Sequence, residues 1–211
     1  MSWPERKRWL ESWRAAGAEV APMDWYVRLS AAYSETHRYY HNQQHIFECL
    51  AEFASARCLA RQPGIVDLAL WFHDAVYDPR SSDNEERSAE LAQRSCADAG
   101  LSQDAARTVA QLVMATKTHE CTGDLDAAMM VDVDLSILGR DVDRFCEYER
   151  QIRQEYAWVP DPIFASKRAE ILNRFLSRPR LFTTDWFFRK YELQARQNLE
   201  LSIQNLTSSL A

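Results

Sequence analysis

The spacing of glycine and proline restricts the fold of this chain more than any other sequence feature. Only five glycines and seven prolines interrupt 211 residues, and the stretches between them carry apolar side chains at helical intervals. Leucine, alanine, glutamate and arginine, which favour helices, are abundant. We therefore expect an all-α protein, a single compact bundle of about nine or ten helices with almost no strand.

Prolines, glycines and short polar clusters divide the chain into helical segments. Ser102 and Asp141 are placed to begin two of them, and Gly100 and Gly139 to end others. The predicted segments are 4–16, 24–34, 42–60, 63–75, 84–99, 103–118, 126–138, 142–156, 162–176 and 184–206. No repeat or linker separates them, so we expect one domain over residues 1–211, in which helix 184–206 packs on the body.

Composition limits the partners and the compartment. The formal net charge is −6 and the basic residues are scattered, so we expect no nucleic-acid partner. The chain begins with charges interleaved with tryptophans, and no later run is long enough to span a membrane. We therefore expect a cytoplasmic protein without a membrane partner, and the sequence leaves open whether it forms a homodimer.

The cysteines fit this compartment. They form no CxxC pair and are odd in number, which argues against a zinc ribbon and a closed disulfide framework. We expect reduced, mostly buried thiols at all five positions, namely Cys49, Cys58, Cys96, Cys121 and Cys146.

A histidine and an aspartate interrupt an apolar segment. In LALWFHDAVYD, His73 and Asp74 follow five apolar residues, inside what we expect to be a buried helix. An ionised carboxylate left unpaired there would cost several kcal/mol, so it needs hydrogen bonds, a cation or a metal. A metal would also explain the histidine beside it.

Two carboxylates, Asp132 and Asp134, interrupt a second apolar segment, MMVDVDLSILG. Either could instead cap a helix or pair with an arginine. On an unbroken helix, residues three and four positions away share a face. These neighbours are all apolar for Asp134 and mixed for Asp132. We therefore expect Asp134 to face the core as a metal ligand, and Asp132 to lie nearer the surface.

Three of the five histidines recur every four residues in THRYYHNQQH, at His37, His41 and His45. On a helix they would share one face. This spacing alone is equally compatible with a polar helix face on which the histidines are coincidental.

Together these blocks resemble the HD-domain superfamily of metal-dependent phosphohydrolases. A histidine is followed by a His-Asp dipeptide 28 residues later and by an aspartate 60 residues after that. The chain is similar to predicted HD-type phosphohydrolases of bacteria in five blocks, YYHNQQHI, WFHDAVYDP, NEERSAELA, ATKTH and VDVDLSILG. The resemblance spans residues 25–180. The resemblance implies a metal site of His45, His73, Asp74 and Asp134, with His41 as the rival first ligand.

The resemblance also implies a reaction, the cleavage of a phosphate ester in a small phosphorylated substrate, such as a nucleotide. Mixed nitrogen and oxygen ligands suit Mn, Fe, Co, Ni or Zn ions better than calcium, and Mg is a further candidate for the divalent ion. Such an ion would lower the pKa of a water molecule toward neutrality and draw charge from the phosphoryl oxygens. Asp74 would then be essential to catalysis as a metal ligand.

Charged residues near these blocks are further candidates. Arg38 and Lys117 could bind the substrate phosphate, and Lys117 could also support catalysis, although both could be solvated surface charges. Asp78 and Glu85 are catalytic candidates that could act as the general acid or orient the water. Either could equally cap a helix.

Two histidines beyond the ligand set are candidate substrate-binding residues. His41 lies four residues before His45. His119 continues a helical stripe through Leu112 and Thr116, so we expect it at the mouth of the site.

Other functions compete with hydrolysis. The HD superfamily includes di-iron oxygenases, and His41 and His119 could extend the site to a second metal. It also includes proteins that bind a nucleotide without hydrolysing it, and fold alone does not separate these functions. A helical scaffold with no site would make the charges in WFHDAV and VDVDLSIL coincidental, and we do not favour it.

Overall fold

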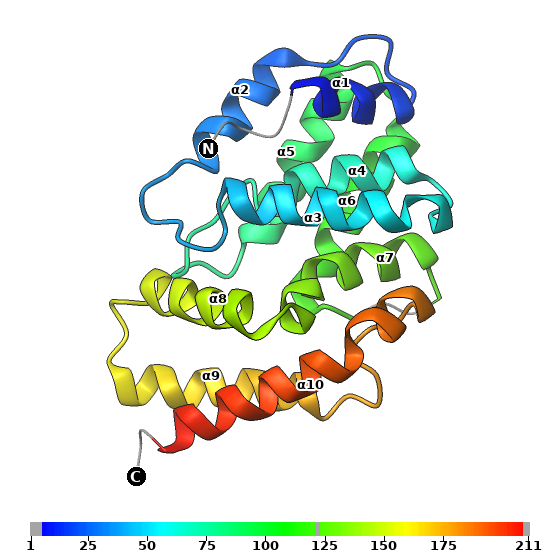
Figure 1. The fold of residues 1–211 in the computed structure, drawn as a ribbon. Coiled ribbons are helices and arrows are strands. Elements are labelled where there is room, and N and C mark those ends of the chain that lie inside the picture. The colour runs from blue at the N-terminus through cyan, green and yellow to red at the C-terminus, as the bar shows by residue number, and fades with distance from the viewer. Residues whose placement is uncertain (1–5, 121–122, 209–211) are drawn as a thin grey trace. The chain divides into compact units, whose positions relative to one another are not determined.

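The computed structural model describes residues 6–120 and 123–208 (Figure 1). Within these ranges it contains ten α-helices and two short 3-10 helices and no strand, which confirms the all-α prediction. The helices are α1 (Arg6–Ala15), α2 (Met23–Ala32), α3 (Gln43–Ala56), η1 (Arg57–Leu59), α4 (Pro63–Phe72), α5 (Asn84–Asp98), α6 (Gln103–Thr118), α7 (Leu125–Asp134), η2 (Leu135–Gly139), α8 (Val142–Glu155), α9 (Asp161–Leu176) and α10 (Asp185–Ser208).

The chain divides into two compact units, the N-terminal unit of residues 1–134 and the C-terminal unit of residues 135–211. The single domain over residues 1–211 stays a prediction. In the described ranges, no helix combines the length and the apolar character that crossing a membrane requires. Cys49 and Cys96 are buried and free, Cys58 and Cys146 are exposed and free, and Cys121 lies outside the described residues.

Every predicted helix is present, and α6 has the predicted bounds. The expected caps also form, because Ser102 accepts a hydrogen bond from Ala105 N at 3.2 Å and Asp141 accepts one from Arg144 N at 3.0 Å. Gly100 follows α5 with φ +72°, a backbone conformation that favours glycine.

Several predicted helices end earlier than expected. Helices α3 and α7 each give way to a 3-10 helix before the predicted end, and α4 ends at Phe72, three residues before it.

The N-terminal unit is built around α4, in which all nine residues after Pro63 are buried. A helix that is apolar on every side belongs in a core, and α4 contacts α1, α3, α5, α6 and α7 (Figure 1). Gly64 permits the contact with α1, because a Cβ at this position would lie 2.3 Å from the carbonyl carbon of Ala15. The residues that directly follow α4, His73 and Asp74, therefore lie among the helices of this unit.

In the C-terminal unit, α10 packs on α9 and η2. Asn198 of α10 donates hydrogen bonds to the carbonyls of Leu138 at 2.8 Å and Arg140 at 2.9 Å. Gly139 lies against α10, where an added Cβ would be 2.5 Å from the Cβ of Tyr191. Gly139 thus lies at the end of a helix, as expected, and its lack of a side chain also allows α10 to pack closely against it.

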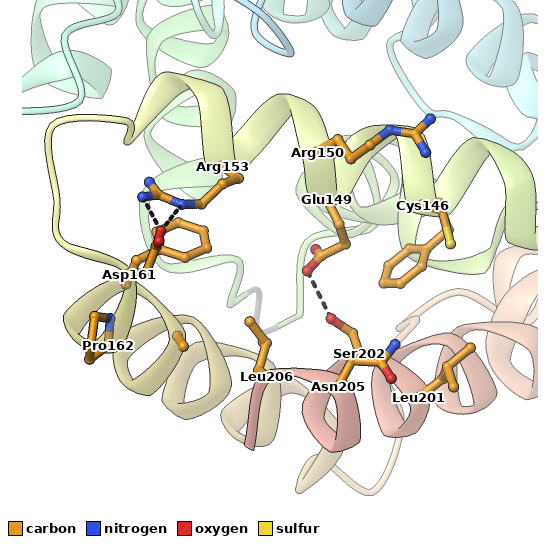
Figure 2. Close-up of a pocket in the computed structure, with 13 residues that line it drawn as sticks. Cys146, Glu149, Arg150, Arg153, Asp161, Pro162, Leu201, Ser202, Asn205 and Leu206 are labelled. Atoms are coloured by element: carbon orange, nitrogen blue, oxygen red, sulfur yellow. Dashed lines mark hydrogen bonds and ion pairs between the residues drawn. The ribbon is translucent and has the colours of Figure 1, made fainter. Parts of the chain in front are cut away.

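A pocket of about 660 Å³ in the C-terminal unit lies between α8, α9 and α10 (Figure 2). Its wall is mainly apolar, and its polar side chains largely pair with one another. Arg153 forms an ion pair with Asp161 at 2.6 Å, and Ser202 donates a hydrogen bond to Glu149 at 2.8 Å (Figure 2). No site residue predicted from the sequence lines this pocket.

Candidate metal centre

The His-Asp dipeptide lies just beyond the end of α4, which corrects the expectation that it lies inside the helix. Helix α4 ends at Phe72, His73 is its C-cap residue, and Asp74 follows in a turn. The last carbonyl groups of a helix need other partners. Here His73 Nδ1 bonds to the carbonyl of Leu70 at 3.0 Å, and Tyr33 donates to that of Trp71 at 3.1 Å. Side chains thus stabilise the end of the helix at this point.

Arg38 fixes the turn that carries Asp74. Its guanidinium donates to the carbonyls of Asp74 at 2.6 Å, Ala75 at 3.1 Å and His41 at 3.3 Å, and pairs with Glu35 at 2.8 Å. The Arg38 side chain is only 1% exposed. The expectation that Arg38 binds a substrate phosphate is therefore corrected, because its hydrogen-bonding groups face the protein interior.

Four ligand atoms converge from α3, the end of α4 and the end of α7. The Nε2 atoms of His45 and His73 are 3.0 Å apart. Asp74 Oδ2 lies 3.3 Å from His45 Nε2 and 3.1 Å from His73 Nε2. Asp134 Oδ1 lies 3.3 and 3.5 Å from the same two nitrogens. Ligands bonded to one metal at octahedral or tetrahedral angles lie roughly 3.0–3.4 Å apart, so these spacings fit a shared ion.

Charge also favours a cation among these groups. Burial disfavours the charged form of all four side chains, but their interactions with neighbouring groups outweigh burial. These interactions raise the pKa values of His45 and His73 well above the usual range. They hold the pKa values of Asp74 and Asp134 well below the usual range. Two imidazolium rings with facing nitrogens would repel each other. A divalent cation between neutral imidazoles and two carboxylates balances the charge without this repulsion, so these residues fit a metal ion.

The tautomer of His73 suits a metal ligand. The His73 Nδ1–H group donates to the carbonyl of Leu70, so in the neutral ring the lone pair of Nε2 is directed at the cluster. Metal-binding histidines usually hold their second nitrogen in this way.

The structure brings His45, and not His41, to the other ligands. His37 and His41 precede α3, which Asn42 caps by accepting a hydrogen bond from Gln44 N at 2.8 Å, so the three histidines do not share a helix face as expected. The ring of His41 stacks on Tyr77, with centroids 4.0 Å apart, and its centroid is 5.9 Å from that of His45. His41 therefore borders the cluster.

The structure also brings Asp134 into the cluster, but not for the expected reason. Asp132 is fully buried, at 0% exposure, whereas the Asp134 side chain is 14% exposed. The expectation that Asp132 lies nearer the surface is thus wrong. The α-helix ends at Asp134, where η2 begins, so the face pattern of an unbroken helix does not apply there.

His119 lies beside Asp134, with its Nε2 atom 3.0 Å from Asp134 Oδ2. It does not continue the helical stripe, because it is the C-cap residue of α6 in the left-handed conformation, with φ 50°. This turn directs the ring toward the carboxylate. The His119 side chain is 27% exposed, so it borders the solvent-facing side of Asp134.

The remaining predicted residues have other contacts. Lys117 pairs with Glu86 and donates to the carbonyl of Ser82 at 2.8 Å, which ties α6 to the start of α5. Asp78 is exposed, and its carboxylate accepts a hydrogen bond from Arg80 N at 2.9 Å within a turn. Glu85 lies in the first turn of α5, where a negative charge is favourable. The described contacts of these residues do not join them to the four ligands.

Sequence reasoning missed Cys49, a buried residue one helical turn after His45 on α3. His45, Cys49, His73 and Asp134 each place a ligand atom within 4.8 Å of the others, a group that could hold a metal ion. The four-residue spacing from His45 is the sequence signal that could have revealed it.

Comparisons of the chain with models of protein families, with curated proteins and with solved structures find no match.

Proposed function

We propose that this chain is a metal-dependent phosphohydrolase of the HD type, which cleaves a phosphate ester in a small substrate such as a nucleotide. The observation that carries the proposal is the convergence of His45, His73, Asp74 and Asp134, with facing ligand atoms 3.0–3.5 Å apart. The resemblance of the sequence blocks to HD phosphohydrolases supports the reaction class. We place the protein in the cytoplasm, where its free thiols stay reduced.

The four ligands have distinct roles in this proposal. His45 and His73 supply neutral nitrogens from the core, while Asp74 and Asp134 supply the negative charge that retains a cation. A bound divalent ion would activate a water molecule and withdraw charge from the phosphoryl oxygens.

Exposure indicates the side from which substrate approaches. The Asp74 and Asp134 side chains are 18% and 14% exposed, whereas those of His45 and His73 are 2% and 1% exposed. The carboxylate side of the cluster therefore faces solvent. A substrate arriving there meets His119, which is the protein group best placed to contact its phosphate.

A screen for phosphate release tests the proposal. The protein would be assayed on nucleotides and sugar phosphates with Mn²⁺, Fe²⁺, Co²⁺, Ni²⁺, Zn²⁺ or Mg²⁺, each with and without chelator. We expect at least one substrate to release phosphate, and Asp74→Ala to abolish that release, because it removes a metal ligand. Lys117→Ala should lower the rate by roughly ten- to a hundredfold at most. Asp104→Ala, which changes an exposed aspartate of α6, is the matched control.

One observation favours a second candidate, a di-iron oxygenase. The two carboxylate oxygens of Asp134 face different histidines, with Oδ1 toward His45 and His73 and Oδ2 toward His119. A carboxylate that bridges two metals has this arrangement. Oxygen consumption by the iron-loaded protein, without phosphate release from any substrate, would favour the oxygenase and reject the hydrolase.

A further inference from the structure

Cys49 is a buried cysteine that lies beside a candidate metal ligand. It is 2% exposed, and its Sγ atom lies 3.7 Å from both ring nitrogens of His45. The sulfur is therefore equidistant from the two ring nitrogens, one of which is the Nε2 atom that faces the other ligands. The four-residue spacing on α3 accounts for this contact, and it places a soft sulfur next to a candidate metal ligand.

Cys96, the other buried cysteine described in the N-terminal unit, shows the contrast. It is fully buried on α5, and burial alone raises the pKa of its thiol to about 12. Such a thiol is chemically inert. Cys96 is therefore the natural control for Cys49.

The distances from Cys49 are close to those of a sulfur ligand. Metal–sulfur bonds are about 2.3 Å long and metal–nitrogen bonds about 2.1 Å. A sulfur and a nitrogen bound to the same ion therefore lie about 3.6 Å apart at a tetrahedral angle, and at most about 4.4 Å apart when they are on opposite sides of the ion. The Cys49–His45 separation of 3.7 Å agrees with the first value. All ligand atoms of the group lie within 4.8 Å of one another. Because the sulfur is equidistant from the two ring nitrogens, it reaches an ion bound to Nε2 after a rotation of the Cys49 side chain.

We infer that Cys49 is a sulfur ligand of the metal centre, and that the site therefore selects a thiophilic ion such as Zn²⁺, Fe²⁺ or Co²⁺ over Mg²⁺ and Mn²⁺. Thiolate ligands favour the first group, whereas carboxylate and water ligands favour the second. On binding, the thiol releases its proton to solvent and the sulfur bonds to the ion, with no change of oxidation state. The inference rests on the proposed metal site, and it restricts the ion in that site to one that binds sulfur well.

Absorption spectroscopy of the Co²⁺-loaded protein tests the inference without an activity assay. We expect visible ligand-field bands together with a near-ultraviolet sulfur-to-cobalt charge-transfer band. Cys49→Ser should lose the charge-transfer band but keep the visible bands, and Cys96→Ser should keep both. Competition titrations should show Zn²⁺ binding weakened about tenfold or more in Cys49→Ser, with Mg²⁺ binding unchanged.

The outcomes separate the two proposals. Visible bands without a charge-transfer band in the unaltered protein would overturn the sulfur ligand and leave the metal site in place. If Mg²⁺ or Mn²⁺ bound but Co²⁺ and Zn²⁺ did not, the sulfur ligand would be overturned; if none of the six ions of the phosphate-release screen bound, the proposed function itself would fail. X-ray absorption at the zinc edge of the unaltered protein needs no variant and guards against misfolding of Cys49→Ser. Sulfur scattering at about 2.3 Å supports the inference, and nitrogen and oxygen scattering alone overturns it.

Discussion

At the scale of single residues, the contact between His119 and Asp134 combines an unusual backbone conformation with a place in the candidate site. His119 adopts φ 50°, which is uncommon for a residue other than glycine, and its ring reaches the Asp134 carboxylate at 3.0 Å. A conformation of this kind costs about 1 kcal/mol or more and persists where the surrounding structure fixes it. Orienting the Asp134 carboxylate, a candidate metal ligand, is a role that would justify this cost.

Replacing His119 with asparagine removes the ring while keeping a residue that tolerates the left-handed conformation. We expect His119→Asn to weaken metal binding about 10- to 100-fold, as is typical for the loss of a group that orients a ligand. Isothermal titration calorimetry with Zn²⁺ or Mn²⁺ measures this. His37→Asn, which changes an exposed histidine, should leave the affinity unchanged. Equal affinities for the two variants would remove His119 from the site.

Asp132 and Asp134, in the last turn of α7, should respond differently to loss of charge. Asp134→Asn should lower metal content, because Asp134 Oδ1 faces both ligand histidines. Asp132→Asn should keep the metal but reduce the free energy of unfolding by about 1–3 kcal/mol, because Asp132 is fully buried. Elemental analysis and urea unfolding distinguish the two effects. Loss of metal in Asp132→Asn alone would show that Asp132 is the ligand.

At the scale of elements, the end of α4 decides the geometry of the site. The apolar run predicts a buried helix here, but it does not predict that the helix stops at Phe72. The stop depends on distant side chains, since Tyr33 and Arg38 bond to carbonyls in and just after the last turn. Such tertiary contacts cannot be deduced from local sequence, which is why Arg38 was misassigned to substrate.

The stability of this turn tests the role of Arg38. Arg38→Lys retains the charge but loses the planar group that contacts several acceptors at once. We expect the free energy of unfolding to fall by about 2–4 kcal/mol, and metal binding to weaken with it. Arg87→Lys, on the exposed face of α5, should change stability by no more than about 0.5 kcal/mol. Matching urea midpoints for the two variants would contradict this account.

At the scale of the whole molecule, helical periodicity and chain breakers predicted the ten helices because both signals are local. The residues of the candidate site came from blocks that resemble HD phosphohydrolases, and the structure brings His45, His73, Asp74 and Asp134 together. Cys49 was missed because its only sequence signal, the four-residue spacing from His45, is also what an ordinary buried helix face produces.

The stability of the metal-free protein should depend on pH in a defined direction. The raised pKa values of His45 and His73 contribute stability that is complete below the ordinary value of 6.5 and is lost as pH rises through the folded values. The lowered values of Asp74 and Asp134 contribute stability that is present above 3.8 and is lost as pH falls through the folded values.

The chelated protein should therefore be most stable in mildly acidic solution and less stable at alkaline pH. Urea unfolding in the presence of chelator, at several pH values between about 4 and 9, measures the trend. His73→Gln, which removes one of the titrating rings, should flatten the alkaline decline. A decline of the same size in His73→Gln would show that it arises elsewhere in the chain.

Metal content is the measurement that tests the central claim most directly. The account predicts that protein purified without chelator carries about one transition-metal ion per chain. It also predicts that His73→Ala and Asp74→Ala, analysed by the same elemental method and confirmed to be folded, carry almost none. Metal content in both folded variants equal to that of the unaltered protein would contradict the account.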